Sequence, residues 1–137
     1  MRRPMIVTTV FSLVLILSAA AAVAAGSGAL FVGSGADISA IKSAERTTYG
    51  GYVYAVHVAG GYAILKWLGN PEGHGYVGYH RVSGEVWQQI ANGGGEGELG
   101  NKGNGAKSRL LHAGVPAAIV AKLCANWPSD ANPCPDY

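Results

Sequence analysis

The clearest pattern in the chain is a pair of β-rich segments, YVYAVHVA and YAILKWL, that flank Gly60-Gly61. Two adjacent glycines accept the positive φ angles of a two-residue turn, so the sequence predicts a β-hairpin over residues 52–68. A second pair of segments, GYVGYHRV and EVWQQIA, is separated by Ser83-Gly84 and predicts a second hairpin. Together they predict a four-stranded antiparallel β-meander, which needs covering helices to be stable.

The first hairpin distributes its side chains unequally between the two faces of the sheet, because opposed residues share a face. We expect the apolar face to form the core, and it carries Tyr54, Val56, Val58, Ala63, Leu65 and Trp67. We expect the mixed face to be either solvated or part of a site, and it carries Ala55, His57, Ala59, Tyr62, Ile64 and Lys66.

Three short helices complete the predicted fold. Asp37 is a suitable N-cap for a helix over residues 38–46. A second helix is expected from about Ala106 to Gly114, where glycine can end it, and a third follows Pro116 in the segment AAIVAKLCA. The sequence therefore predicts an α+β domain with one short N-terminal helix, in which the two C-terminal helices cover the β-meander.

The first quarter of the chain has the pattern of a secretory signal. Two arginines precede an apolar stretch from Met5 to Leu17, and an alanine-rich segment follows. We expect a signal peptide over residues 1–25, a flexible leader over 26–36 and one small domain over 37–137. A retained anchor is the alternative, because about twenty residues of this hydropathy could span a bilayer. We expect a secreted or periplasmic protein that meets the membrane only through its signal segment.

Export changes how the charges and the cysteines are interpreted. The chain has ten Lys and Arg against eight Asp and Glu, and loss of the two N-terminal arginines leaves eight of each sign. A neutral domain lacks the positive charge on which nucleic-acid affinity depends, so we expect no nucleic-acid partner. Cys124 and Cys134 are expected to pair as a disulfide in an oxidising compartment.

The glycine-rich stretch NGGGEGELGNKGNGAKS, residues 92–108, invites comparison with a phosphate-binding loop. Such a loop requires G-x-x-x-x-G-K-[ST], whereas here Ala106 precedes Lys107-Ser108 and Gly105 lies one position too early. An antiparallel meander also lacks the parallel sheet on which this motif sits. We therefore expect no nucleotide ligand, and a mobile surface loop between sheet and helix.

Catalytic chemistry has weak support in the sequence. His74 and His80 would lie about 20 Å apart along one strand, too far for a shared metal ion. The chain has no G-x-S-x-G elbow, and Glu72, Glu85, Glu96 and Glu98 fall at turns or in the glycine-rich loop. We assign no catalytic residue, metal site or cofactor. The alternative is a small secreted hydrolase or metal-dependent enzyme that uses His57 or His80.

A binding surface is better supported, because aromatic residues are concentrated in the strand region. Tyrosine contributes contact area and a hydroxyl group at low entropic cost. We expect binding either through the mixed sheet face, with His57, Tyr62, Lys66 and His80, or through the loop over residues 93–105. The partner we expect is an envelope or extracellular protein.

Several short motifs follow one another along the chain in this order: YAILKW, GHGYVGYHR, SGEVW, GGG and LLHAGVPAAIVAKL. This pattern, over about residues 62–123, resembles a loosely defined group of small exported, uncharacterised bacterial proteins. The chain departs from the group's pattern in its aliphatic strand, which reads YVGY here, and at His74, which interrupts paired glycines. The resemblance implies export and an α+β domain, and it implies no reaction.

Overall fold

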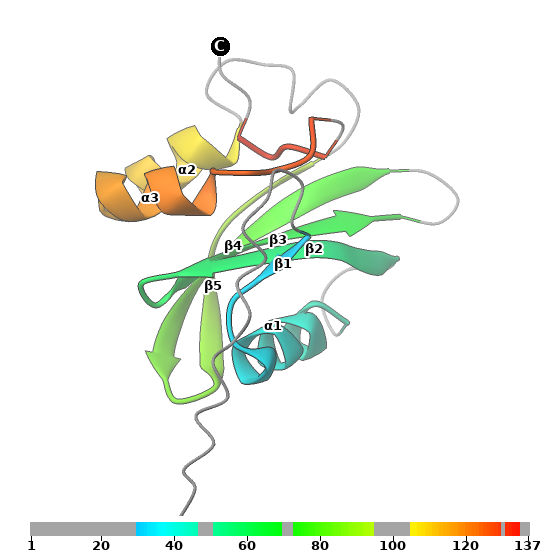
Figure 1. Ribbon diagram of the computed structural model, residues 1–137, viewed down its shortest axis with the longest axis horizontal. Coiled ribbons are helices and arrows are strands. Elements are labelled where there is room, and N and C mark those ends of the chain that lie inside the picture. Colours follow the sequence, from blue (N-terminus) through cyan, green and yellow to red (C-terminus); the bar gives the residue numbers. More distant parts are fainter. Residues whose placement is uncertain (1–29, 47–50, 70–72, 95–104, 130, 135–137) are drawn as a thin grey trace, which may run out of the picture.

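The computed structural model describes residues 30–46, 51–69, 73–94, 105–129 and 131–134. It is an α+β structure with a five-stranded sheet (Figure 1). The strands are β1 Phe31–Val32, β2 Tyr52–Ala59, β3 Tyr62–Leu68, β4 His74–Ser83 and β5 Val86–Gly94, and the helices are α1 Gly35–Arg46, α2 Ala106–His112 and α3 Ala117–Leu123. The predicted α+β class is confirmed, but the sheet has one strand more than predicted.

The extra strand makes the sheet mixed. The order is β1-β2-β3-β4-β5, in which β2 to β5 form the predicted antiparallel meander and β1 pairs in parallel with β2. The Val56 N–H donates to the Leu30 carbonyl at 2.8 Å. A two-residue strand shows no alternation, so the sequence pattern could not reveal it. Residues 30–36, predicted as leader, thus belong to the fold, whereas the predicted signal peptide over 1–25 lies outside the described residues.

Helix α1 begins earlier than predicted because Ser34, rather than Asp37, caps it. The Asp37 backbone N–H donates to Ser34 Oγ at 3.2 Å, which satisfies one of the N–H groups left open at a helix start. Asp37 then lies in the first turn, where its carboxylate pairs with Arg81 of β4 at 2.6 Å. The cap was misplaced by three residues because serine and aspartate are both good capping residues.

Helices cover both faces of the sheet (Figure 1). Helix α1 packs on the predicted core face, where Ile41 joins a cluster with Val56, Ala63, Leu65 and Val77. Helices α2 and α3 lie on the opposite, mixed face, where their buried side chains are Ala106, Leu110, Val120 and Leu123. The C-terminal helices do cover the sheet as predicted, but they cover the face that we expected to be solvated or part of a site.

A β-bulge in β2 corrects one face assignment. The pairing of β2 with β3 is regular from Ala59↔Tyr62 to Ala55↔Lys66, as the Gly60-Gly61 turn predicts. It then shifts between Val53 and Ala55, so that Val53 pairs with Trp67. Tyr54 is the additional residue, and it packs with the cluster under α2 and α3 instead of the cluster under α1.

Glycines allow close packing where β3, β4 and β5 run together. A Cβ at Gly75 would lie 2.6 Å from the Gly93 carbonyl and 2.6 Å from the Trp67 ring. A Cβ at Gly93 would lie 2.7 Å from the ring of Tyr76. Aromatic rings therefore occupy the space above these glycines, and this explains why the glycine-rich stretch begins inside β5.

The disulfide between Cys124 and Cys134, predicted from the sequence, is present with a Cα–Cα distance of 5.6 Å. It joins the end of α3 to the last described residues. The stretch between the two cysteines carries Trp127, which is buried in the cluster under α2 and α3. In the described part of the chain, no helix combines the length and apolar character that crossing a membrane requires.

We expect Gly75→Ala to lower the free energy of unfolding by about 1–3 kcal/mol, because the new methyl group would overlap a carbonyl and an indole ring. Gly35→Ala is the matched control, since nothing lies within 4 Å of its Cβ position, and we expect little change. Urea denaturation followed by tryptophan fluorescence measures both. Equal stabilities for the two variants would contradict the packing described for Gly75.

Candidate functional site

Two of the four predicted binding residues are buried. His57 is 2% exposed and stacks on Trp127, with ring centroids 3.9 Å apart. Lys66 is 4% exposed, its Nζ lies 3.1 Å from His74 Nδ1, and burial lowers the pKa of this lysine. The register predicted from the Gly60-Gly61 turn is correct, but helices and the C-terminal segment cover these positions. The predicted four-residue binding surface is therefore not one accessible surface.

The other two predicted residues lie together and remain half-buried. Tyr62 of β3 and His80 of β4 are register partners, and their rings stack with centroids 4.6 Å apart. The β4–β5 register is irregular between Arg81 and Ser83, which leaves Val82 as an additional residue near the turn. Val82 and Val86 are 51% and 58% exposed. The end of the β4–β5 hairpin therefore presents two exposed apolar side chains.

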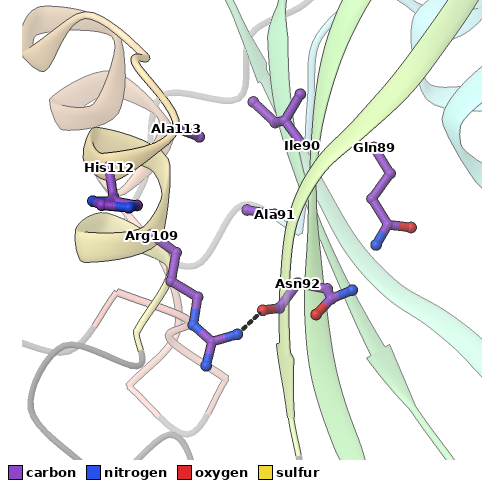
Figure 2. Close-up of a pocket in the computed structure, with 7 residues that line it drawn as sticks. All are labelled: Gln89, Ile90, Ala91, Asn92, Arg109, His112 and Ala113. Atoms are coloured by element: carbon purple, nitrogen blue, oxygen red, sulfur yellow. Dashed lines mark hydrogen bonds between the residues drawn. The ribbon is translucent and has the colours of Figure 1, made fainter.

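Strand β5 is one edge of the sheet, and a cleft of about 600 Å³ separates its second half from α2 (Figure 2). An edge strand has one row of backbone N–H and C=O groups that no neighbouring strand uses. The residues that line the cleft are Gln89, Ile90, Ala91, Asn92, Arg109, His112 and Ala113.

Asn92 links β5 to α2 across the cleft. Its backbone carbonyl projects toward α2 and accepts a hydrogen bond from Nη1 of Arg109 (Figure 2). In an antiparallel strand the N–H and C=O groups of one residue point to the same side. The Asn92 N–H therefore also points away from β4, and this residue presents its backbone to the cleft.

A β-bulge divides β5 into two segments. Gly78 pairs with Ala91 and Tyr79 with Gln89, which leaves Ile90 as the additional residue. The first segment carries exposed Val86, and the second lies beside α2. Bulges of this kind limit indiscriminate pairing between sheet edges, so the edge is open over two short segments rather than along one long ladder.

Sequence reasoning missed Asn92, Arg109 and His112 because a strand becomes an edge strand only through its topology. The available signal was the polar composition of VWQQIANGG, since a strand between two others is usually more apolar. The predicted binding loop over residues 93–105 is described only at its two ends. Gly93 and Gly94 belong to β5 and Gly105 precedes α2, whereas residues 95–104 lie outside the described residues.

The four histidines lie in different settings. His57 contacts Trp127, His74 contacts Lys66, His80 contacts Tyr62, and His112 lines the cleft on α2. Within the described residues, no group of three or more His, Cys, Asp and Glu side chains is placed to hold a metal ion. The hydrolase or metalloenzyme alternative therefore gains no supporting geometry from this part of the chain.

On the other face of the sheet, Glu45 of α1 is a buried acid that is 3% exposed. Its Oε2 accepts a hydrogen bond from the Tyr79 hydroxyl at 3.4 Å, and its Oε1 has no partner among the described residues. Burial raises the pKa of Glu45 from 4.5 to about 7, and the bond from Tyr79 opposes this shift. This carboxyl group lies beneath α1, away from the cleft at β5.

Comparison with known proteins identifies no relative. No protein-family model, curated protein or solved structure matches the chain. The resemblance to small exported bacterial proteins therefore stays a prediction, and the functional argument depends on the geometry of the site.

We expect the free energy of unfolding to fall as pH rises from about 4.5 to about 7, because the folded state retains a proton on Glu45 that the unfolded chain releases. The contribution should be on the order of 1–3 kcal/mol. It is fully present below pH 4.5 and lost as pH passes the folded-state pKa. Glu45→Gln should remove this slope and be more stable than the native chain at pH 8.

Urea titrations at pH 4.5, 6 and 8 measure the effect. Glu85→Gln is the control, because Glu85 is an exposed acid in the β4–β5 turn and its replacement should leave the slope unchanged. If Glu45→Gln retained the native pH slope, Glu45 would not be the group that holds the proton.

Proposed function

We propose that the protein is an exported, non-catalytic binding module that recognises an extended segment of a partner protein by adding it as a strand to β5. The observation that carries this proposal is the cleft of about 600 Å³ between the edge strand β5 and helix α2. In strand addition, backbone hydrogen bonds provide affinity and pockets for alternate side chains provide specificity.

The backbone of Asn92 supports this mode of binding. Its carbonyl faces the cleft and is bonded to Arg109, so an incoming strand would have to exchange or share this hydrogen bond. Helix α2 forms the opposite wall of the cleft, and the bonded Arg109 spans from that wall to β5. An extended segment fits between a strand and a helix because its own backbone completes the sheet, while its side chains alternate between the two faces.

The proposed partner is an envelope or extracellular protein. The disulfide between Cys124 and Cys134 supports this setting, because disulfides persist in oxidising compartments. The predicted signal segment and the resemblance to small exported proteins point the same way. The module would work in the periplasm or outside the cell.

We expect Asn92→Pro to block binding while preserving the fold, because proline removes an N–H that faces away from β4 and is tolerated at sheet edges. The probe is a library of random linear octapeptides displayed on phage, selected against protein exported from a bacterial host. Recovery of enriched clones on Asn92→Pro should fall at least about tenfold.

Asn92→Ala is the matched control, because it keeps the backbone N–H and should retain the clones. Circular dichroism melting curves check that both variants fold. Absence of enriched clones on the native protein, or equal recovery on Asn92→Pro, would overturn strand addition at β5.

A further inference from the structure

The disulfide cross-links the two helices of the C-terminal layer at the ends that the chain does not join directly. Residues 113–116 connect the end of α2 to the start of α3. Cys124 follows the end of α3, and its bond to Cys134 holds residues 131–134 there. The disulfide therefore ties the end of α3 to the segment that lies against the start of α2.

This same segment caps α2. Helix α2 has no side-chain cap, and the N–H of its first residue, Ala106, donates to the Pro133 carbonyl at 2.8 Å. The N–H groups of a first helical turn have no acceptor within the helix, so the carbonyl satisfies one of them. Ala131 and Cys134 are 5% and 4% exposed, and Pro133 is fully buried. Residues 131–134 are thus packed onto the start of α2.

A second cleft, of about 260 Å³, lies between α2 and α3 and is lined by both cysteines. Its walls include Leu111 of α2 and Ala117 and Ala121 of α3, all three of which are exposed. Cys124 is half-buried, whereas Cys134 is 4% exposed. A small molecule in this cleft would therefore meet the disulfide, and Cys124 is the more accessible of the two cysteines.

We propose that this disulfide is a thiol–disulfide exchange site, at which a dithiol enters the cleft between α2 and α3 and attacks Sγ of Cys124. Exchange depends on access to a sulfur atom, and exposed disulfides are the labile ones. The site is separate from the binding edge proposed at β5, and it would operate whether or not a strand is added there.

The exchange takes place in two steps. A thiolate of the dithiol forms a bond to Sγ of Cys124, the bond to Cys134 breaks, and Cys134 leaves as a thiolate that takes up a proton. The second thiolate of the dithiol then attacks the dithiol's own sulfur in the mixed disulfide and displaces Cys124, which also takes up a proton. Two electrons and two protons pass to the protein, and the dithiol becomes a cyclic disulfide.

Reduction would act on one end of the helical layer. It removes the cross-link that holds residues 131–134, so the bond from the Ala106 N–H to the Pro133 carbonyl would depend on local packing alone. The ladders that join β2 to β3, β3 to β4 and β4 to β5 do not involve this segment. We therefore expect the start of α2 to open more often in the reduced protein while the sheet stays intact.

Reduction kinetics of the oxidised, exported protein test direct attack. Dithiothreitol is the probe, and samples quenched with excess iodoacetamide are analysed by mass spectrometry. We expect a rate that is proportional to the dithiothreitol concentration and nearly independent of urea below the unfolding transition, because the folded protein is attacked. If attack required unfolding, the rate would rise exponentially with urea, as the unfolded fraction does. That result would overturn the proposal.

Two substitutions on α3 assign the route of attack. Ala121→Leu places a larger side chain in the cleft, one helical turn before Cys124, and should slow reduction at least about fivefold by limiting access. Ala118→Leu is the matched control, because Ala118 is exposed on the same helix and does not line the cleft. Circular dichroism melting curves check that both variants fold. Equal reduction rates for the two variants would overturn attack through this cleft.

Hydrogen exchange of the oxidised and reduced proteins tests the local effect. The Ala106 amide should exchange at least about tenfold faster after reduction, while the amides of β3 and β4 retain their protection. Unchanged exchange at Ala106 would contradict the release of residues 131–134. Loss of protection in β3 and β4 together with Ala106 would show that the disulfide holds the whole fold, and would overturn its assignment as a local exchange site.

Discussion

The need to cover both faces of one small sheet determines the rest of the structure. Val56, Leu65 and Val77 are buried on one face, and Ala55, Ile64 and Tyr76 are buried on the other. A sheet that is apolar on both faces requires a helical layer on each side. Helix α1 provides one layer and α2 with α3 provides the other, so the surfaces left open are the sheet edges and the end of the β4–β5 hairpin.

This arrangement explains why β5 is the most accessible part of the sheet for a partner. The opposite edge is β1, a strand of two residues that offers little backbone to pair with. Strand β5 has nine residues, and a cleft lies between its second half and α2. The bulge at Ile90 and the bond from Arg109 restrict which chains can pair there, as the edges of natural sheets require.

The hairpins were predictable because their signals are local. Gly60 and Gly61 adopt positive φ angles of 56° and 79°, and the register that they set between β2 and β3 was predicted correctly as far as Ala55. Tyr54 was placed on the wrong face because a bulge has no clear local signal. Gly114 likewise has the positive φ of a helix stop, at 92°.

The candidate site was much harder to predict because it depends on which elements meet. Alternation showed that His57 and Lys66 share a face with Tyr62, but it could not show that both would be buried, His57 against Trp127 and Lys66 next to His74. Ile64 and Ala55 on the same face were the available sign that this face is covered. Asn92 and Arg109 are distant in the sequence, and no spacing rule brings them together.

Nuclear magnetic resonance of the ¹⁵N-labelled protein, titrated with a selected octapeptide, tests strand addition at β5 most directly. Chemical-shift changes and intermolecular nuclear Overhauser effects should follow β5 from Val86 to Gly94 and the side of α2 that faces it. Signals from α1 and β1 should remain in place. Contacts that map to α1 or β1 while β5 is unchanged would contradict the assignment of β5 as the binding edge.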